Sequence, residues 1–216
     1  MSINFCPSAI EWGNIGEWAA ALATLAAAGL ALWFSLHEAR VRSTERKFAA
    51  RIFAQRIVHE VQFVQISVTR IRVSLWKMKI LGAARENWPN LVRMVQPLST
   101  PIIQESFETI VLLGENSAKF VIGLEGNLQS VRKMTQPWGA TVEELQADPR
   151  TESLVDPLLD LTKQLQLHAN GALTCCWEVA QYEGLPPIGE AADPEKSEEL
   201  ARRELAAAAP TLAQNA

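Results

Sequence analysis

The sequence predicts an all-α protein in which an N-terminal transmembrane helix is continuous with a small antiparallel cytoplasmic helical bundle. Residues 18–36 form an uncharged apolar run. Three later segments repeat apolar residues at intervals of three and four, the spacing of one face of an α-helix. A length of 216 residues suits one domain with an anchor. The 48% share of hydrophobic residues excludes a wholly disordered chain, and three cysteines exclude a disulfide scaffold.

The apolar run reads WAAALATLAAAGLALWFSL. As a helix it extends about 28 Å, close to the thickness of the hydrocarbon layer of a bilayer. Trp18 at one end, and Trp33 and Phe34 at the other, stand where aromatic residues gather at membrane interfaces. We therefore expect a transmembrane helix at 18–36, preceded by a short extracytoplasmic N-terminus at 1–17. Eight alanines make the run only moderately apolar, and an Ala-rich helix buried in a soluble core is the alternative.

Charge is distributed unevenly along the chain. Residues 37–86 contain 11 Lys and Arg against 4 acidic residues, whereas residues 87–216 contain 9 against 18. Basic residues directly after a span favour a cytoplasmic location for the part that follows, which leaves the N-terminus outside. The residues expected to set this orientation and to contact lipid headgroups are Arg40, Arg42, Arg46, Lys47 and Arg51.

The segment WGNIGEWAAALATLAAAGLALW, from Trp12 to Trp33, leads into a basic helix. In this it resembles uncharacterised small bacterial single-pass inner-membrane proteins that have an N-terminal Trp/Ala-rich anchor. The resemblance covers about residues 10–50. It implies a location in the bacterial inner membrane and transfers no active-site residue.

Small residues recur along one face of the predicted span. Repeated small residues let two helices approach closely in lipid, which predicts a homo-oligomer. Any Ala-rich span also produces such rows by chance, so this alternative stays open. The predicted association row is Ala19, Ala23, Ala27 and Ala31.

The bundle is expected over residues 37–184, and its first helix follows the span without an intervening Gly or Pro. Residues 61–75 are rich in β-branched side chains, so a strand is the alternative there. The spacing of apolar residues favours a helix because it runs unbroken in steps of three and four. The stripe is Ile57, Val61, Val64, Val68, Ile71, Leu75 and Met78.

A short helix is expected near 89–95, followed by a long helix that starts at Thr100 as N-cap and stops at Pro137. Thr141 and Glu144 fit a capping box for one short helix before Asp148. The stripe of the long helix is Ile103, Phe107, Ile110, Gly114, Ser117, Val121, Leu124, Leu128 and Val131.

The last long helix is expected from about Glu152 to Glu183, with Gly184 as its terminator. Residues 185–216 lose periodicity and predict a disordered tail, within which 193–209 could form a transient helix that orders on a partner. The stripe of the last helix is Leu158, Leu161, Leu165, His168, Ala172, Cys175, Val179 and Tyr182.

The residue pattern predicts no catalytic, cofactor-binding or metal-binding site. His59 and Glu60 begin like a zinc-protease helix, but Phe63 stands where the second histidine should be. Cys175 and Cys176 lack the spacer of redox and zinc pairs. We expect Cys175 to pack as a small apolar residue and His168 to be a hydrogen-bonded core or interface residue. Gly123 and Gly126 are expected to mark close helix packing.

These features predict a membrane-anchored scaffold or sensor-type interaction protein without catalytic activity of its own. Its expected partners are the lipid bilayer, further copies of the chain and a protein encoded nearby. A membrane-perturbing effector of pore-forming, toxin or defence type is the alternative. A nucleic-acid-binding membrane protein is a third and less favoured alternative, because acidic residues can neutralise the farther basic group. That group is Arg70, Arg72, Lys77, Lys79 and Arg85.

Overall fold

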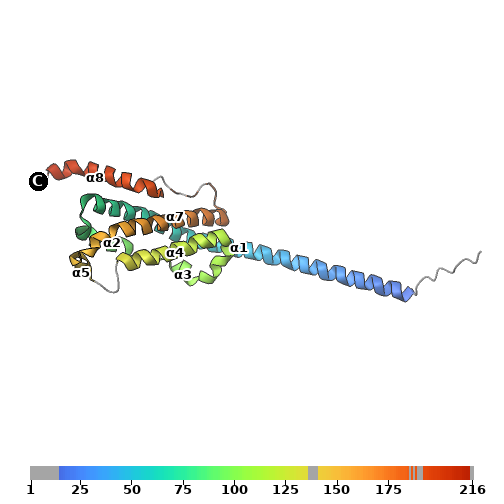
Figure 1. Cartoon of the computed structure of the whole chain (residues 1–216). Helices are drawn as coiled ribbons and strands as arrows, with labels where there is room; N and C mark the ends of the chain where they lie inside the picture. Colours follow the sequence, from blue (N-terminus) through green and yellow to red (C-terminus); the bar gives the residue numbers. More distant parts are fainter. Residues whose placement is uncertain (1–14, 136–140, 185, 187, 189–191, 215–216) are drawn as a thin grey trace, which may run out of the picture. The chain divides into compact units, whose positions relative to one another are not determined.

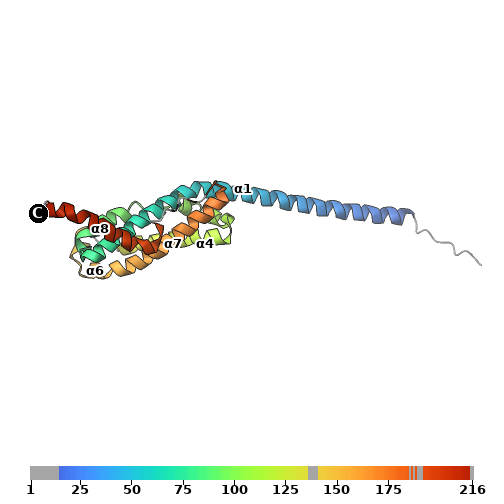
Figure 2. The same cartoon turned by 90° about the horizontal axis from the view of Figure 1, so that it is seen from above.

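The computed structural model describes residues 15–135, 141–184, 186, 188 and 192–214. Within these residues the chain is helical and contains no strand, which confirms the prediction of an all-α protein. The chain divides into two compact units, Met1–Arg46 and Lys47–Ala216. The helices of the second unit lie side by side, as both Figure 1 and Figure 2 show.

The first helix, α1 (Ile15–Leu81), includes residues of both units. In the second unit, every member of the stripe predicted from Ile57 to Met78 is buried. This confirms a helix over residues 61–75 in spite of their β-branched side chains. Burial of one continuous apolar face outweighs the small difference in intrinsic propensity. The short helix expected near 89–95 is present as α2 (Ala84–Val95).

The single long helix expected from Thr100 to Pro137 is wrong. The chain instead forms α3 (Pro101–Glu105), the 3₁₀ helix η1 (Phe107–Leu113) and α4 (Glu115–Thr135). Gly114 separates the last two with a φ of 88°, which a helix cannot include. The α-helical backbone also ends at Ser106, and Phe107 directly after it, predicted to be in the core, is 51% exposed. The predicted stop at Pro137 lies outside the described residues.

Thr100 occupies the N-cap position of α3, but its side chain does not cap that helix. The carboxylate of Glu60, on α1, accepts hydrogen bonds from the backbone N–H groups of Ile102 (2.9 Å) and Ile103 (3.3 Å) instead. The predicted cap is therefore corrected. A long-range contact supplies the acceptors that the local sequence was expected to supply.

The capping box of Thr141 and Glu144 is confirmed at the start of α5 (Val142–Ala147). It is followed by α6 (Arg150–Ser153) and α7 (Val155–Ala180). The expected long helix is thus shorter at both ends. Gln181 takes the left-handed conformation that closes α7, and Gly184, the predicted terminator, lies three residues farther on.

The C-terminal part also differs from expectation. The prediction was a disordered tail over 185–216 with a transient helix at 193–209. Among the described residues of this range, the structure has η4 (Pro194–Lys196) and α8 (Ser197–Gln214). Ala192, Pro194, Ser197 and Ala201 are buried. Small residues at these positions let the segment approach the body closely, but they produce no strong apolar periodicity in the sequence.

The core of the second unit is formed mainly by α1, α2, α4 and α7. The helix α4 packs chiefly against α7. A Cβ atom built on Gly123 of α4 would lie 2.1 Å from the ring of His168, and one built on Gly171 of α7 would lie 2.4 Å from the ring of Phe120. Each helix therefore offers a glycine to an aromatic ring of the other. Gly126, also predicted to mark close packing, has no such neighbour within 4 Å.

Candidate functional site

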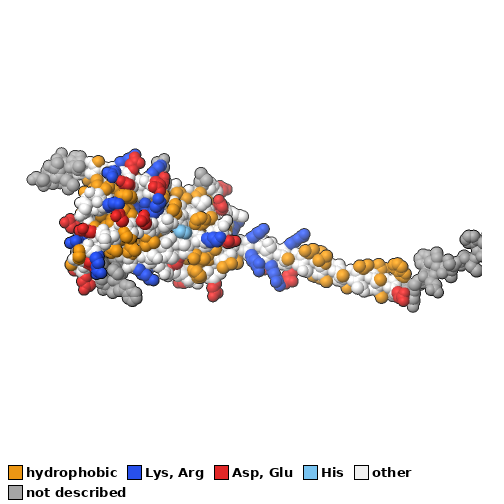
Figure 3. Space-filling view, in the orientation of Figure 1, with side chains coloured by type: hydrophobic (Ala, Val, Ile, Leu, Met, Phe, Trp, Pro, Cys, Tyr) orange, Lys and Arg blue, Asp and Glu red, His pale blue; other side chains and the backbone are white. Residues whose placement is uncertain are grey.

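The apolar segment of α1 exposes its side chains along its whole length. Residues 17–48 are all exposed, and the exposed fraction of the large apolar residues among them ranges from 42% at Val41 to 69% at Leu25. One helix in the described part of the chain is long and apolar enough to cross a membrane, and this segment provides that property. Figure 3 shows hydrophobic side chains along it, followed by Lys and Arg side chains. Ala19, Ala23, Ala27 and Ala31 lie four residues apart on this exposed helix.

The first basic group is also exposed. Arg42 forms an ion pair with Glu38 one turn earlier on α1. Among the described residues, the other members of the group form no ion pair, so their charges remain available to solvent or to an anionic surface. These members are Arg40, Arg46, Lys47 and Arg51.

The second basic group is largely neutralised by acidic residues that are distant in sequence. Nζ of Lys79 lies 2.7 Å from Asp156, and Nε of Arg85 lies 3.1 Å from Glu152. Lys77 pairs with Glu204 of α8 at 2.5 Å. The predicted intramolecular pairing is therefore confirmed for Lys77, Lys79 and Arg85.

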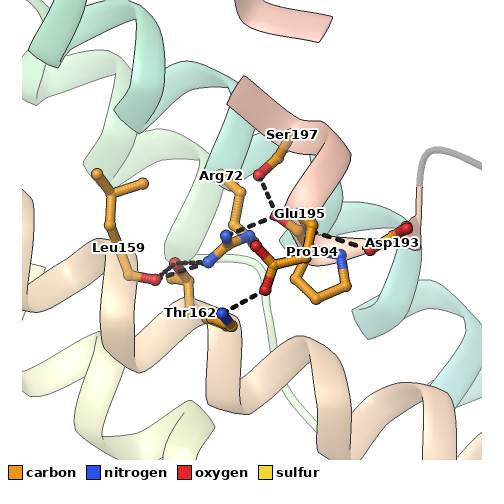
Figure 4. A network of polar contacts seen from close by, with 8 residues as sticks. Arg72, Leu159, Thr162, Asp193, Pro194, Glu195 and Ser197 are labelled. Atoms are coloured by element: carbon orange, nitrogen blue, oxygen red, sulfur yellow. Dashed lines mark hydrogen bonds and ion pairs between the residues drawn. The ribbon is translucent and has the colours of Figure 1, made fainter. Parts of the chain in front are cut away.

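Arg72 is a buried cation at the junction of three segments (Figure 4). Its Nη1 donates to the carbonyl oxygen of Leu159 on α7 at 2.6 Å, and its Nη2 donates to the carbonyl oxygen of Pro194 at 3.0 Å. Thr162 accepts a longer hydrogen bond of 3.4 Å from Nη1. Burial lowers the pKa of Arg72, while the negative charges of Glu195 and Asp160 act in the opposite direction. Arg72 thus joins α1 to α7 and to the C-terminal segment chiefly through backbone carbonyls.

Further polar contacts hold residues 192–204 against the body. The side-chain amides of Gln166 and Asn170, on α7, both donate to the carbonyl oxygen of Ala192, at 2.7 and 3.0 Å. Lys163 forms an ion pair with Glu195. Asp193 accepts from the backbone N–H of Glu195 at 3.0 Å and so caps η4. The C-terminal segment is therefore a docked part of the second unit.

A pocket of about 550 Å³ lies between α1 and α8, with Met94 of α2 contributing to its wall. The remaining lining residues combine apolar side chains with hydroxyl, amide and charged groups. Arg70, which is exposed, is a cation of this pocket that has no ion pair among the described residues. The residues that line the pocket from α1 are Gln65, Ile66, Thr69, Arg70, Val73, Ser74 and Lys77, and those from the C-terminal segment are Ala192, Leu200 and Glu204.

Glu125 of α4 is a second buried charged residue, only 6% exposed. The hydroxyl of Thr100 donates to one of its oxygens. The amides of Gln104 and Gln129 donate to the other, at 2.7 and 2.8 Å. These donors satisfy the carboxylate within the fold, which gives it a structural role in holding the segment before α3 against α4.

Cys175, Cys176 and His168 are packed or hydrogen-bonded side chains of the second unit. Cys176 is fully buried and Cys175 only partly, so the residue expected in the core was wrong by one position. Burial, with a smaller contribution from Cys175, raises the pKa of Cys176 to about 12, and a neutral thiol is a poor nucleophile. Nδ1 of His168 lies 2.8 Å from the carbonyl oxygen of Gln164 and 3.1 Å from the amide nitrogen of Asn127. His168 is therefore a hydrogen-bonded residue of the α4–α7 interface, as expected.

Among the described residues, no group of three or more His, Cys, Asp or Glu side chains is arranged to hold a metal ion. No protein family, curated protein or solved structure matches this chain. A function for this chain is therefore argued below from the structure of the chain itself.

Sequence reasoning did not single out the pocket or Glu125, and it placed Arg72 in a basic group expected to be neutralised by acidic residues, not buried against backbone carbonyls. Gln65 and Arg72 lie seven residues apart, directly beside the apolar stripe of α1, and both are buried. Two polar residues at helical spacing beside an apolar stripe are a sequence pattern that could have indicated buried polar side chains on α1. The sequence near Arg72 does not indicate that the carbonyl oxygen of Pro194 accepts a hydrogen bond from it.

Proposed function

We propose that this chain is a membrane-anchored helical interaction protein of scaffold or sensor type, located in a bacterial inner membrane. In this proposal residues 18–36 cross the bilayer, the N-terminus lies outside, and the second unit lies in the cytoplasm as an antiparallel bundle. The proposal assigns no bond chemistry to the chain. It assigns to the second unit the binding of a protein partner.

The observation that carries the proposal is the contrast between the two units. The apolar side chains between Trp18 and Leu36 are exposed, whereas the second unit buries a core of its own. Exposing so many large apolar side chains to water is unfavourable by about 25 cal/mol for each Å². A bilayer removes this cost, and the helix satisfies its own backbone N–H and C=O groups, as the hydrocarbon layer requires. The basic residues after Leu36 support the proposed orientation, because positive charge is retained on the cytoplasmic side.

Two pairs of contacts support the antiparallel arrangement of α4 and α7. Gly123 meets His168, and Phe120 meets Gly171. Going from Phe120 to Gly123 along α4, the contacted residue on α7 changes from Gly171 to His168, so the two helices run in opposite directions.

Membrane insertion is tested by sodium carbonate extraction of membranes from cells that express the full chain. We expect the wild-type protein to stay in the pellet. Leu25→Arg places a charge at the middle of the span, which costs about 2.5–3.5 kcal/mol, and it should move the protein to the supernatant. Leu167→Arg, at an exposed leucine of α7, is the matched control and should stay in the pellet. Extraction of the wild-type protein, or retention of Leu25→Arg, would refute the anchor.

Orientation is tested with a membrane-impermeant maleimide on intact spheroplasts. We expect Cys6 to react from outside, and Cys6→Ser to remove the label. Labelling that requires lysis of the spheroplasts would reverse the proposed topology.

Homo-oligomerisation through the alanine row is tested by cross-linking in membranes. Ala23→Leu should reduce the cross-linked species, because a larger side chain separates the helices. Ala21→Leu, the same substitution on another face of α1, should not. If expression instead depolarised the cells, a membrane-perturbing effector would replace the scaffold proposal.

A further inference from the structure

The cations of α1 that lie near the pocket differ in how they are neutralised. Lys77 and Lys79 each have a carboxylate partner, and Arg72 donates hydrogen bonds to two backbone carbonyl oxygens. Arg70 lines the pocket and has no carboxylate partner among the residues that the structure describes. Its guanidinium therefore has donors available for an anion that enters the pocket.

The charges that line the pocket are unbalanced. Arg70 and Lys77 provide two cations, and Glu204 provides one carboxylate. Because Glu204 already pairs with Lys77, the net positive charge of the pocket resides at Arg70. A ligand with one negative charge would balance it.

The rest of the lining favours an apolar ligand body. Ile66 and Val73 stand one turn before and one turn after Arg70 on α1, facing the same space. Ile66 is 44% exposed although it lines a concave surface, so a bound apolar group would remove area of this side chain from water. The other apolar wall residues are Met94, Ala192 and Leu200.

We propose that this pocket binds a small soluble amphipathic carboxylate, whose anionic group pairs with Arg70 and whose hydrocarbon body lies against the apolar wall. The volume of about 550 Å³ falls in the range typical of small-molecule sites, which combine apolar walls with a few polar groups that fix orientation. The site lies within the second unit, so it does not depend on the membrane anchor or on the scaffold role proposed above.

The proposal is tested by calorimetric titration of the full chain in phosphatidylcholine nanodiscs, with empty nanodiscs as the blank for partition into lipid. The probes are octanoate, octanamide and acetate. We expect saturable binding of octanoate. Octanamide, which lacks the charge, should bind at least about ten-fold more weakly, and acetate, which lacks the apolar body, should not bind measurably.

Two variants that act in opposite directions assign the anionic contact. Arg70→Gln should weaken octanoate binding at least about ten-fold while leaving octanamide binding unchanged. Glu204→Gln releases Lys77 from its ion pair and should strengthen octanoate binding by about three- to five-fold. The Glu204 side chain is exposed and Lys77 is half-buried, so loss of this one ion pair should leave α8 docked through its remaining contacts. Arg93→Gln is the control, because Arg93 is an exposed arginine outside the pocket.

Unchanged circular dichroism and thermal midpoints identify variants that remain folded. Equal binding of octanoate and octanamide, wild-type affinity in Arg70→Gln, or no saturable binding of octanoate would each overturn the proposal. Loss of octanoate binding only in nanodiscs that contain phosphatidylglycerol would show that an anionic lipid occupies the pocket, and would overturn the assignment to a soluble ligand.

Discussion

The imidazole ring of His168, on α7, occupies the space beside Gly123, on α4, where a Cβ atom would lie 2.1 Å from Cδ2 of the ring. The rings of His168 and Phe120 meet edge to face, with centroids 6.3 Å apart. The α4–α7 interface thus depends on the absence of a side chain at particular positions. One of these positions faces a polar ring, His168, that is hydrogen-bonded to its own helix.

Gly123→Ala should lower the free energy of unfolding by about 1–3 kcal/mol, because the added methyl group forces the His168 ring or the helix to move. Gly126→Ala, on the same helix, meets nothing within 4 Å. It should raise stability by about 0.5–1 kcal/mol through helix propensity. Chemical denaturation followed by tryptophan fluorescence measures both. A Gly123→Ala protein as stable as Gly126→Ala would show that the interface has room for the methyl group.

Arg72→Met should loosen the C-terminal segment, because the carbonyl oxygens of Leu159 and Pro194 lose the donor that joins them. The cost of leaving a buried carbonyl without its donor is about 1–3 kcal/mol. Limited proteolysis should therefore cleave faster after Arg202 and Arg203 of α8 than in the wild-type protein. Arg93→Met, at an exposed arginine, is the control. Equal cleavage rates in the two variants would refute the role of Arg72 in docking.

Glu60→Ala should destabilise the start of α3, because two backbone N–H groups lose their acceptor. The expected loss is about 1–2 kcal/mol, the range of a lost N-cap. Hydrogen–deuterium exchange should become faster in peptides that cover residues 98–106. Glu183→Ala removes an exposed carboxylate elsewhere and should leave that exchange unchanged. Protection that persists in Glu60→Ala would mean that Thr100 or solvent supplies the cap.

Stability should fall at high pH because of Cys176. Burial raises its pKa to about 12 from an ordinary value of 9.0. Between these values the native state keeps a proton that the unfolded chain releases, so the free energy of unfolding decreases as pH rises, by at most about 1.4 kcal/mol per pH unit. Cys176→Ala should lack this part of the slope in denaturation measurements between about pH 8 and about pH 10. Identical slopes for the two proteins would show that the thiol does not contribute.

The spacing of apolar residues in the sequence was sufficient to predict the stripe from Ile57 to Met78, every member of which is buried in the core. It was insufficient at Phe107 and Gly114, where the same spacing continued through a break in the helix. The three- and four-residue spacing of apolar residues predicts which residues share a face, provided that the backbone is helical throughout. It does not predict where a residue with positive φ, such as Gly114, interrupts the helix.

The cap of α3 and the docking of the C-terminal segment could not be predicted for a related reason. Thr100 was the best local cap, yet its hydroxyl donates to Glu125 while Glu60 caps the helix. Ala192 and Pro194 are held by Gln166 and Arg72, from distant parts of the chain. The stabilisation from such long-range hydrogen bonds depends on which donors and acceptors are buried next to one another. The sequence does not show this, because it is decided by how the helices pack.

The sequence by itself determined the all-α class, the apolar run at 18–36 and the core face of α1. All of these depend on residue type and on spacing along one continuous segment. The tertiary structure decided the docking of α8, the burial of Arg72 and the pocket that contains Arg70. These features depend on burial and on acceptors contributed by α1, α7 and the C-terminal segment together, and no single segment contains that information.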